Sequence, residues 1–123
     1  MIARCVELGY RINLPFGGGA PYDFIVDTME KLIRVQVKRV YQEENSRNNG
    51  KHWVMRFDKS KIRGKARDRH YTKDDCDYII GYSCEYNIAY VFPIEMVSNR
   101  WCFVLNPDEE IEGKHQKYRE AWF

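Results

Sequence analysis

The sequence lacks the patterns that mark secreted, membrane-spanning or zinc-binding proteins. Its four cysteines, Cys5, Cys76, Cys84 and Cys102, have no CxxC spacing, and its three histidines form no ligand pattern with them. No apolar run approaches the ~20 residues of a membrane span, and no charged-then-apolar start marks a secretion signal. We therefore expect an intracellular, cytoplasmic protein with reduced, mostly buried thiols and no membrane contact.

A strong net charge is absent too, and the distribution of charge is more informative than its total. Twenty Lys and Arg residues against eighteen Asp and Glu residues leave +2 at pH 7, which neither favours nor excludes a nucleic-acid partner. The segment from Lys51 to Lys73 is nevertheless basic, because Asp58 and Asp68 are its only acidic residues. A polyanion would be attracted most strongly to this segment.

The length fits a single domain over residues 1–123. Hydrophobic residues make up 44% and aromatic residues 15%, which is enough for a core, and the composition is not that of a disordered chain. The aromatic residues that we expect to pack in this core are Trp53, Tyr78, Tyr82, Tyr90 and Trp101.

Two neighbouring runs predict an antiparallel hairpin that organises the chain. Pro21–Asp27 and Ile33–Val40 both read as strands, and the turn between them is short. On the second run one face carries Ile33, Val35 and Val37, and the other carries Arg34, Gln36 and Lys38. Asp23 would then lie near Gln36 and Lys38 across the pair. A carboxylate, an amide oxygen and a lysine at one strand end can hold a divalent cation and a phosphate.

Periodicity and turn signals predict the other elements. We expect a helix that ends near Leu8, strands over 10–14, 52–57, 78–84, 88–92 and 101–105, and short helices over 93–97 and 114–122. The predicted order is a helix, about four strands, a basic loop, further strands and short helices, which is an α/β arrangement.

The hairpin residues resemble a known nuclease signature. Pro21-Tyr22-Asp23, followed thirteen positions later by Gln36-Val37-Lys38, resembles the motif of the PD-(D/E)XK nuclease superfamily, in the variant with Gln in place of the acidic residue. The run from Arg34 to Lys38 is similar to the branch that includes bacterial group I intron homing endonucleases.

Later passages extend the resemblance from roughly Ala3 to Trp122. Residues 76–82 and 89–95 resemble the passage that follows the motif strand in this family, and residues 118–122 resemble its closing stretch. The resemblance implies the restriction-endonuclease-like α/β fold, in which a central mixed β-sheet is flanked by helices.

The resemblance also implies a metal-dependent DNA endonuclease that hydrolyses phosphodiester bonds. Asp23, Gln36 and the backbone carbonyl of Val37 would hold Mg²⁺, with Mn²⁺ as an alternative. Lys38 would position the attacking water and neutralise developing charge. A solvated strand face that carries Gln36 and Lys38 is the structural alternative.

One expected residue of the family pattern is missing from its usual place. The family supplies a further acidic residue from the N-terminal helix, at a position that would precede Met1 here. Glu7 is the only acidic residue on the predicted helix. Either Glu7 replaces the usual catalytic acid, or one ligand is missing and the chain is a truncated or catalytically impaired relative.

If the chain is a nuclease, its basic segment is a candidate for DNA contact. Its charges recur at odd positions, as an extended loop along a DNA backbone would present them, although a solvated loop is the alternative. These candidate DNA-binding residues are Lys59, Lys61, Arg63, Lys65, Arg67 and Arg69. We expect double-stranded DNA as the partner and a homodimer or higher homo-oligomer, because one chain carries one site. A Holliday-junction resolvase, a restriction or repair nuclease, or a non-catalytic nucleic-acid-binding relative would share the fold.

Overall fold

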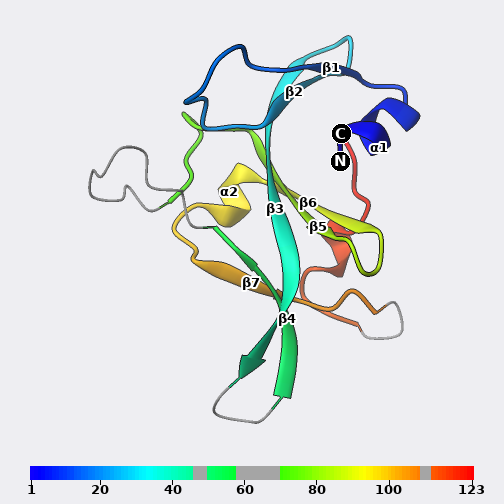
Figure 1. Ribbon diagram of the computed structural model, residues 1–123, viewed down its shortest axis with the longest axis vertical. Coiled ribbons are helices and arrows are strands. Elements are labelled where there is room, and N and C mark those ends of the chain that lie inside the picture. Colours follow the sequence, from blue (N-terminus) through cyan, green and yellow to red (C-terminus); the bar gives the residue numbers. More distant parts are fainter. Residues whose placement is uncertain (46–49, 58–69, 109–111) are drawn as a thin grey trace.

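A seven-stranded sheet forms the scaffold of the protein. Figure 1 shows the computed structural model, which describes residues 1–45, 50–57, 70–108 and 112–123. The strands are β1 (Arg11–Asn13), β2 (Phe24–Asp27), β3 (Leu32–Asn45), β4 (Gly50–Arg56), β5 (Tyr78–Ser83), β6 (Ile88–Pro93) and β7 (Cys102–Leu105). The helices are α1 (Ile2–Glu7), α2 (Ile94–Val97) and the 3₁₀ helix η1 (Gln116–Tyr118). None of the helices in these ranges is long and apolar enough to cross a membrane.

The predicted hairpin is confirmed. Strands β2 and β3 pair antiparallel, with Phe24 opposite Val35. Asp27 closes the turn between them, because its Oδ1 accepts a hydrogen bond from the Met29 backbone N–H at 2.7 Å. Asp27 is therefore a turn residue, and Asp23 lies at the opposite end of β2, beside the middle of β3.

Strand β3 connects the whole sheet. Its first part pairs antiparallel with β2, its last part pairs antiparallel with β4, and residues Val35–Arg39 between them pair parallel with β5. The long β3 therefore runs through the centre of the molecule in Figure 1. The sheet is mixed, as predicted, and the motif residues Gln36 and Lys38 lie where β3 passes from one neighbour to the next.

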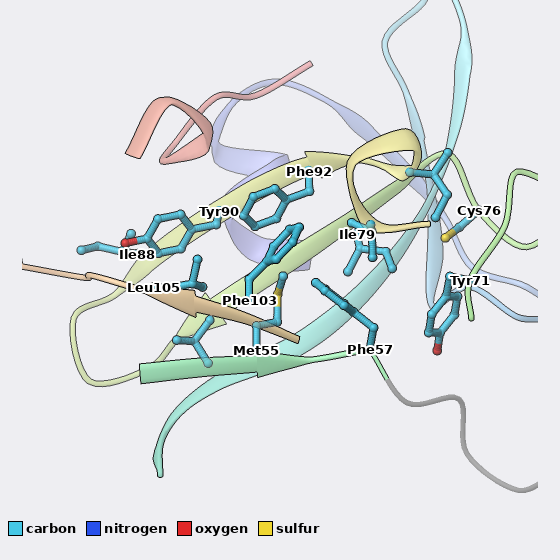
Figure 2. Packing of buried hydrophobic residues seen from close by; sticks show 13 residues of the cluster. Met55, Phe57, Tyr71, Cys76, Ile79, Ile88, Tyr90, Phe92, Phe103 and Leu105 are labelled. Atoms are coloured by element: carbon cyan, nitrogen blue, oxygen red, sulfur yellow. The ribbon is translucent and has the colours of Figure 1, made fainter. Parts of the chain in front are cut away.

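Two hydrophobic clusters pack against the β5–β6 pair. Alternate residues point to opposite faces, so Ile79 joins one cluster and Ile80 joins the other. Figure 2 shows the larger cluster, in which the Phe103 ring lies between Phe57 and Phe92, with centroids 4.9 Å from each. Burial on both faces explains why the β5 and β6 sequences are continuous apolar runs.

The predicted C-terminal helix over 114–122 is wrong. Only η1 forms, and the chain beyond it folds back against α1 and β6. The Glu120 carboxylate accepts hydrogen bonds from the Ala89 backbone N–H, the Trp122 indole and Arg4, all at 2.8–3.0 Å. These tertiary contacts outweigh the local preference for a helix.

Two further expectations hold only in part. All four cysteines are free, but Cys84 and Cys102 are exposed while Cys5 and Cys76 are buried. Trp101 is 48% exposed instead of packing in the core, and its ring contacts His70 with centroids 4.4 Å apart. Of the other predicted core aromatics, Tyr90 is fully buried, and Trp53, Tyr78 and Tyr82 are partly buried.

The packing of β5 against β4 leaves no room for a side chain at Gly81. A Cβ there would collide with the Met55 sulfur and approach the Val40 Cγ2 to 3.2 Å.

We predict that Gly81→Ala lowers the free energy of unfolding by about 1–3 kcal/mol, measured by urea titration. The double variant with Met55→Ala should lose less than the sum of the two single losses, because Met55→Ala removes the colliding atom. Gly18→Ala is the control, since a Cβ at Gly18 meets nothing within 4 Å. Additive losses in the double variant would contradict this packing.

Candidate active site

Two hydrogen bonds hold the Asp23 carboxylate against β3. Its Oδ2 accepts a hydrogen bond from the Val37 backbone N–H at 2.7 Å and another from Gln36 Nε2 at 2.6 Å. The Asp23 backbone N–H donates to the Val35 carbonyl at 2.8 Å, which extends the β2–β3 ladder by one bond. The predicted proximity of Asp23 and Gln36 is therefore present, and it follows from the hairpin register.

The Gln36 amide lies between two oxygens. Its Nε2 donates to Asp23 Oδ2 at 2.6 Å and to the Val37 carbonyl at 3.1 Å. The amide nitrogen thus occupies a point on which a carboxylate oxygen and a carbonyl oxygen both converge. The oxygen and nitrogen ends of an amide have nearly the same shape. If the Gln36 amide turned by half a turn, its oxygen would lie at this point as the third oxygen. Three hard oxygen donors are the ligand type that Mg²⁺ and Mn²⁺ prefer, so these residues fit a divalent cation.

The site has a single carboxylate among these three donors. No group of three or more Asp, Glu, His or Cys residues in the described ranges could hold a metal ion. One negative charge compensates a divalent cation only in part, so the described donors alone would bind it weakly.

Glu7 lies at the end of the first helix, and no described hydrogen bond joins it to Asp23. It is exposed at the last position of α1, and it does not line the open groove of ≈ 450 Å³ beside Asp23. The lining residues are Met1, Ile2, Ala3, Asp23, Phe24, Val37 and Tyr82. The beginning of α1, not its end, therefore borders the site, and the role of Glu7 as a catalytic acid stays a prediction.

Lys38 lies on the same face of β3 as Gln36. Its ammonium nitrogen is 4.9 Å from the centre of the Tyr71 ring, which is within the range of a cation–π contact. Tyr71 is only 5% exposed and belongs to the larger hydrophobic cluster. No local sequence pattern connects Tyr71 with β3, so its place beside Lys38 could not be predicted.

Arg34, also on this face, ties β3 to the turn before β5. Its guanidinium donates to the Asp77 carboxylate at 2.9 and 3.2 Å and to the carbonyls of Lys73 and Asp74 at 2.6 and 2.8 Å. Burial of the Asp77 carboxyl works against its ionisation, but the hydrogen bonds from Arg34 outweigh this effect, so the pKa of Asp77 lies below its usual value. This ion pair fixes the turn that follows Tyr71.

The candidate DNA-binding residues Lys59, Lys61, Arg63, Lys65, Arg67 and Arg69 lie outside the described residues. Their assignment therefore stays a prediction from the sequence.

Comparison with known proteins decides the family. A family model described as PD-(D/E)XK endonuclease matches residues 1–123. The chain belongs to this family. The PD-(D/E)XK chain also resembles the solved structure of a bacterial homing endonuclease, with a TM-score of 0.75 and 26% sequence identity over 98% of this chain and 82% of the other. The search of curated proteins found no match.

These matches confirm the predicted family and the restriction-endonuclease-like fold. The protein is an endonuclease of the PD-(D/E)XK type, and nucleases of this family use divalent metals, generally Mg²⁺. The assignment of Asp23, Gln36 and Lys38 to the three positions of the family motif stays a prediction from the sequence.

Asp77→Asn tests whether the Arg34 ion pair stabilises this region. We predict a loss of about 1 kcal/mol or less at neutral pH, because the pair is partly exposed. The folded-state pKa of Asp77 is depressed, so the contribution is complete above the unfolded-state value of about 4 and fades as the pH falls below it.

Urea unfolding of both proteins at neutral pH and at about pH 3 measures this difference. Asp74→Asn is the control, because Asp74 contacts Arg34 only through its backbone carbonyl. A stability difference between wild type and Asp77→Asn that stays constant with pH would argue against the ion pair.

Proposed function

We propose that the chain is a Mg²⁺-dependent endonuclease that hydrolyses phosphodiester bonds in double-stranded DNA, in the manner of a homing endonuclease. The observation that carries this proposal is the convergence of the Asp23 carboxylate and the Val37 carbonyl on the Gln36 amide. Membership of the PD-(D/E)XK endonuclease family and the likeness to a bacterial homing endonuclease support it. Mn²⁺ would serve as an alternative cation, because it prefers similar ligands.

Each motif residue has a role that follows from its chemistry. Asp23, Gln36 and the Val37 carbonyl would hold the cation, which when bound stabilises charge on the phosphate and acidifies a water molecule. The Lys38 ammonium would orient the attacking water and neutralise negative charge that develops on the phosphate oxygens. Strand β3 carries Gln36, Val37 and Lys38, and hydrogen bonds from the Gln36 amide and the Val37 N–H hold the Asp23 carboxylate. These groups would therefore be positioned before substrate binds.

DNA contact would involve the basic segment as well as the site. Lysine and arginine side chains that neutralise phosphates release counterions, so such binding weakens steeply as the salt concentration rises. The candidate DNA-binding residues of this segment lie outside the described residues, and the proposal for them rests on the sequence.

The enzyme would act as a homodimer or higher homo-oligomer. A single chain carries one candidate site, whereas cutting both strands of a duplex requires two, and a symmetric assembly supplies the second. We also propose a cytoplasmic location, because all four cysteines are free thiols.

A catalytically impaired DNA-binding relative is the second candidate function. The observation that favours it is that the described residues place a single carboxylate at the site, and that Glu7 does not line the groove. A Holliday-junction resolvase or a restriction or repair nuclease would use the same site residues on another DNA substrate.

Nicking of supercoiled plasmid by the purified protein, with Mg²⁺, with Mn²⁺ and with EDTA, tests the proposal. We expect metal-dependent nicking that Asp23→Asn reduces by roughly 100-fold or more, because Asp23 is the one charged ligand that the described residues supply to the site. Lys38→Ala should abolish nicking while DNA binding in a gel-shift assay is retained. Asp27→Asn is the matched control, since Asp27 lies at the other end of β2 and only closes a turn.

The outcomes separate the two candidate functions. Nicking that survives in Asp23→Asn would show that the site is assigned wrongly. DNA binding without nicking under both metals would favour the impaired relative over the nuclease.

A further inference from the structure

We propose that Tyr71 is a positioning residue of this active site, and that the face of its ring holds the Lys38 ammonium in place for catalysis. The inference rests on the proposed function of the site, and it adds a residue that the PD-(D/E)XK motif does not contain. Its basis is the contact between the Lys38 nitrogen and the Tyr71 ring, with the nitrogen 4.9 Å from the ring centre.

The surroundings of the ring strengthen this contact. A cation within about 6 Å of an aromatic ring centre is attracted to the negative face of the ring, and more so where water is excluded. Tyr71 is 5% exposed, and Lys38 is itself partly buried. Water therefore screens the contact less than it screens an exposed lysine on a surface aromatic residue.

Two sets of hydrogen bonds hold the turn that follows Tyr71, and they restrict the movement of the ring. Within the turn, the Thr72 backbone N–H donates to the Asp75 carboxylate at 2.8 Å, and the Asp75 N–H donates back to the Thr72 carbonyl at 3.0 Å. From outside, Arg34 donates to the carbonyls of Lys73 and Asp74. Arg34 lies on β3 on the same face as Lys38, so one strand positions both the lysine and the ring that it contacts.

The phenol group keeps its proton at neutral pH. Burial raises the pKa of Tyr71, and the nearby Cys76, Asp23 and Asp75 raise it further. Tyr71 thus offers a neutral aromatic surface, and not a proton, to the site.

A lysine gains from such a surface because its side chain is long and flexible. If the Lys38 ammonium is already held in one position, its side chain loses less conformational freedom when the attacking water and the phosphate bind. The ring face is the feature required for this role, and the hydroxyl is not.

Three substitutions at position 71 separate the ring from the hydroxyl. Tyr71→Phe keeps the ring face and removes the hydroxyl, whereas Tyr71→Leu keeps an apolar side chain and removes the ring. A fluorinated phenylalanine at position 71 keeps the shape of the ring but weakens its negative face, so it serves where Tyr71→Leu fails to fold. Thermal unfolding identifies the variants that fold.

The first readout is independent of nuclease activity. NMR of the Lys38 side-chain methylene beside the ammonium, assigned by its loss in Lys38→Arg, reports the ring-current shift from a neighbouring aromatic ring. We expect an upfield shift in wild type and in Tyr71→Phe that disappears in Tyr71→Leu. A signal that is the same in Tyr71→Leu as in wild type would overturn the contact, whatever the protein does to DNA.

The second readout is single-turnover nicking of supercoiled plasmid with Mg²⁺ or Mn²⁺. We expect Tyr71→Phe to remain within about threefold of wild type, and Tyr71→Leu to lose roughly tenfold in the rate at saturating protein, with DNA affinity unchanged. The nicking rate of the fluorinated variant should decrease by about as much as that of Tyr71→Leu.

The two readouts distinguish failure of this inference from failure of the proposed function. Equal losses in Tyr71→Phe and Tyr71→Leu would assign the effect to the hydroxyl and overturn the positioning role. Wild-type rates in Tyr71→Leu would overturn it as well. An absence of nicking in wild type would count against the nuclease proposal and remove the catalytic role of Tyr71 with it, while the NMR signal still decides whether the contact exists.

Discussion

The structure depends on the attachment of the Asp23 carboxylate to strand β3. Two hydrogen bonds, from the Val37 backbone N–H and the Gln36 amide, bring a negative charge to the point where β2 stops pairing with β3. A carboxylate held by backbone geometry needs little reorganisation to accept a cation in place of an amide hydrogen. The hairpin register alone therefore creates the candidate metal site.

Three polar residues of strand β3 lie on one face, and each makes a different contact. Arg34 fixes the turn before β5, Gln36 joins Asp23, and Lys38 meets the Tyr71 ring. Over residues 33–37 the opposite face of the strand is apolar and packs on the smaller hydrophobic cluster. This part of β3 thus contributes to both the core and the candidate site.

Local patterns predicted the parts of the site that are close in sequence. The hairpin, the strands and the Asp23–Gln36 contact follow from alternation and a short turn. Tyr71 and Asp77 reach β3 only through the parallel pairing of β3 with β5, which no local pattern encodes. The C-terminal helix was predicted wrongly for the same reason, since the Glu120 contacts to Arg4 and Ala89 are long-range.

The central claim, that Asp23, Gln36 and Val37 hold a divalent cation, is tested most directly by NMR with substoichiometric Mn²⁺. A paramagnetic ion broadens the signals of nearby nuclei, and no DNA target is needed. We expect the backbone amide signals of these three residues to broaden first, an effect that Asp23→Asn removes and Asp27→Asn retains. Broadening centred on another part of the chain, or unchanged in Asp23→Asn, would contradict the assignment of the site.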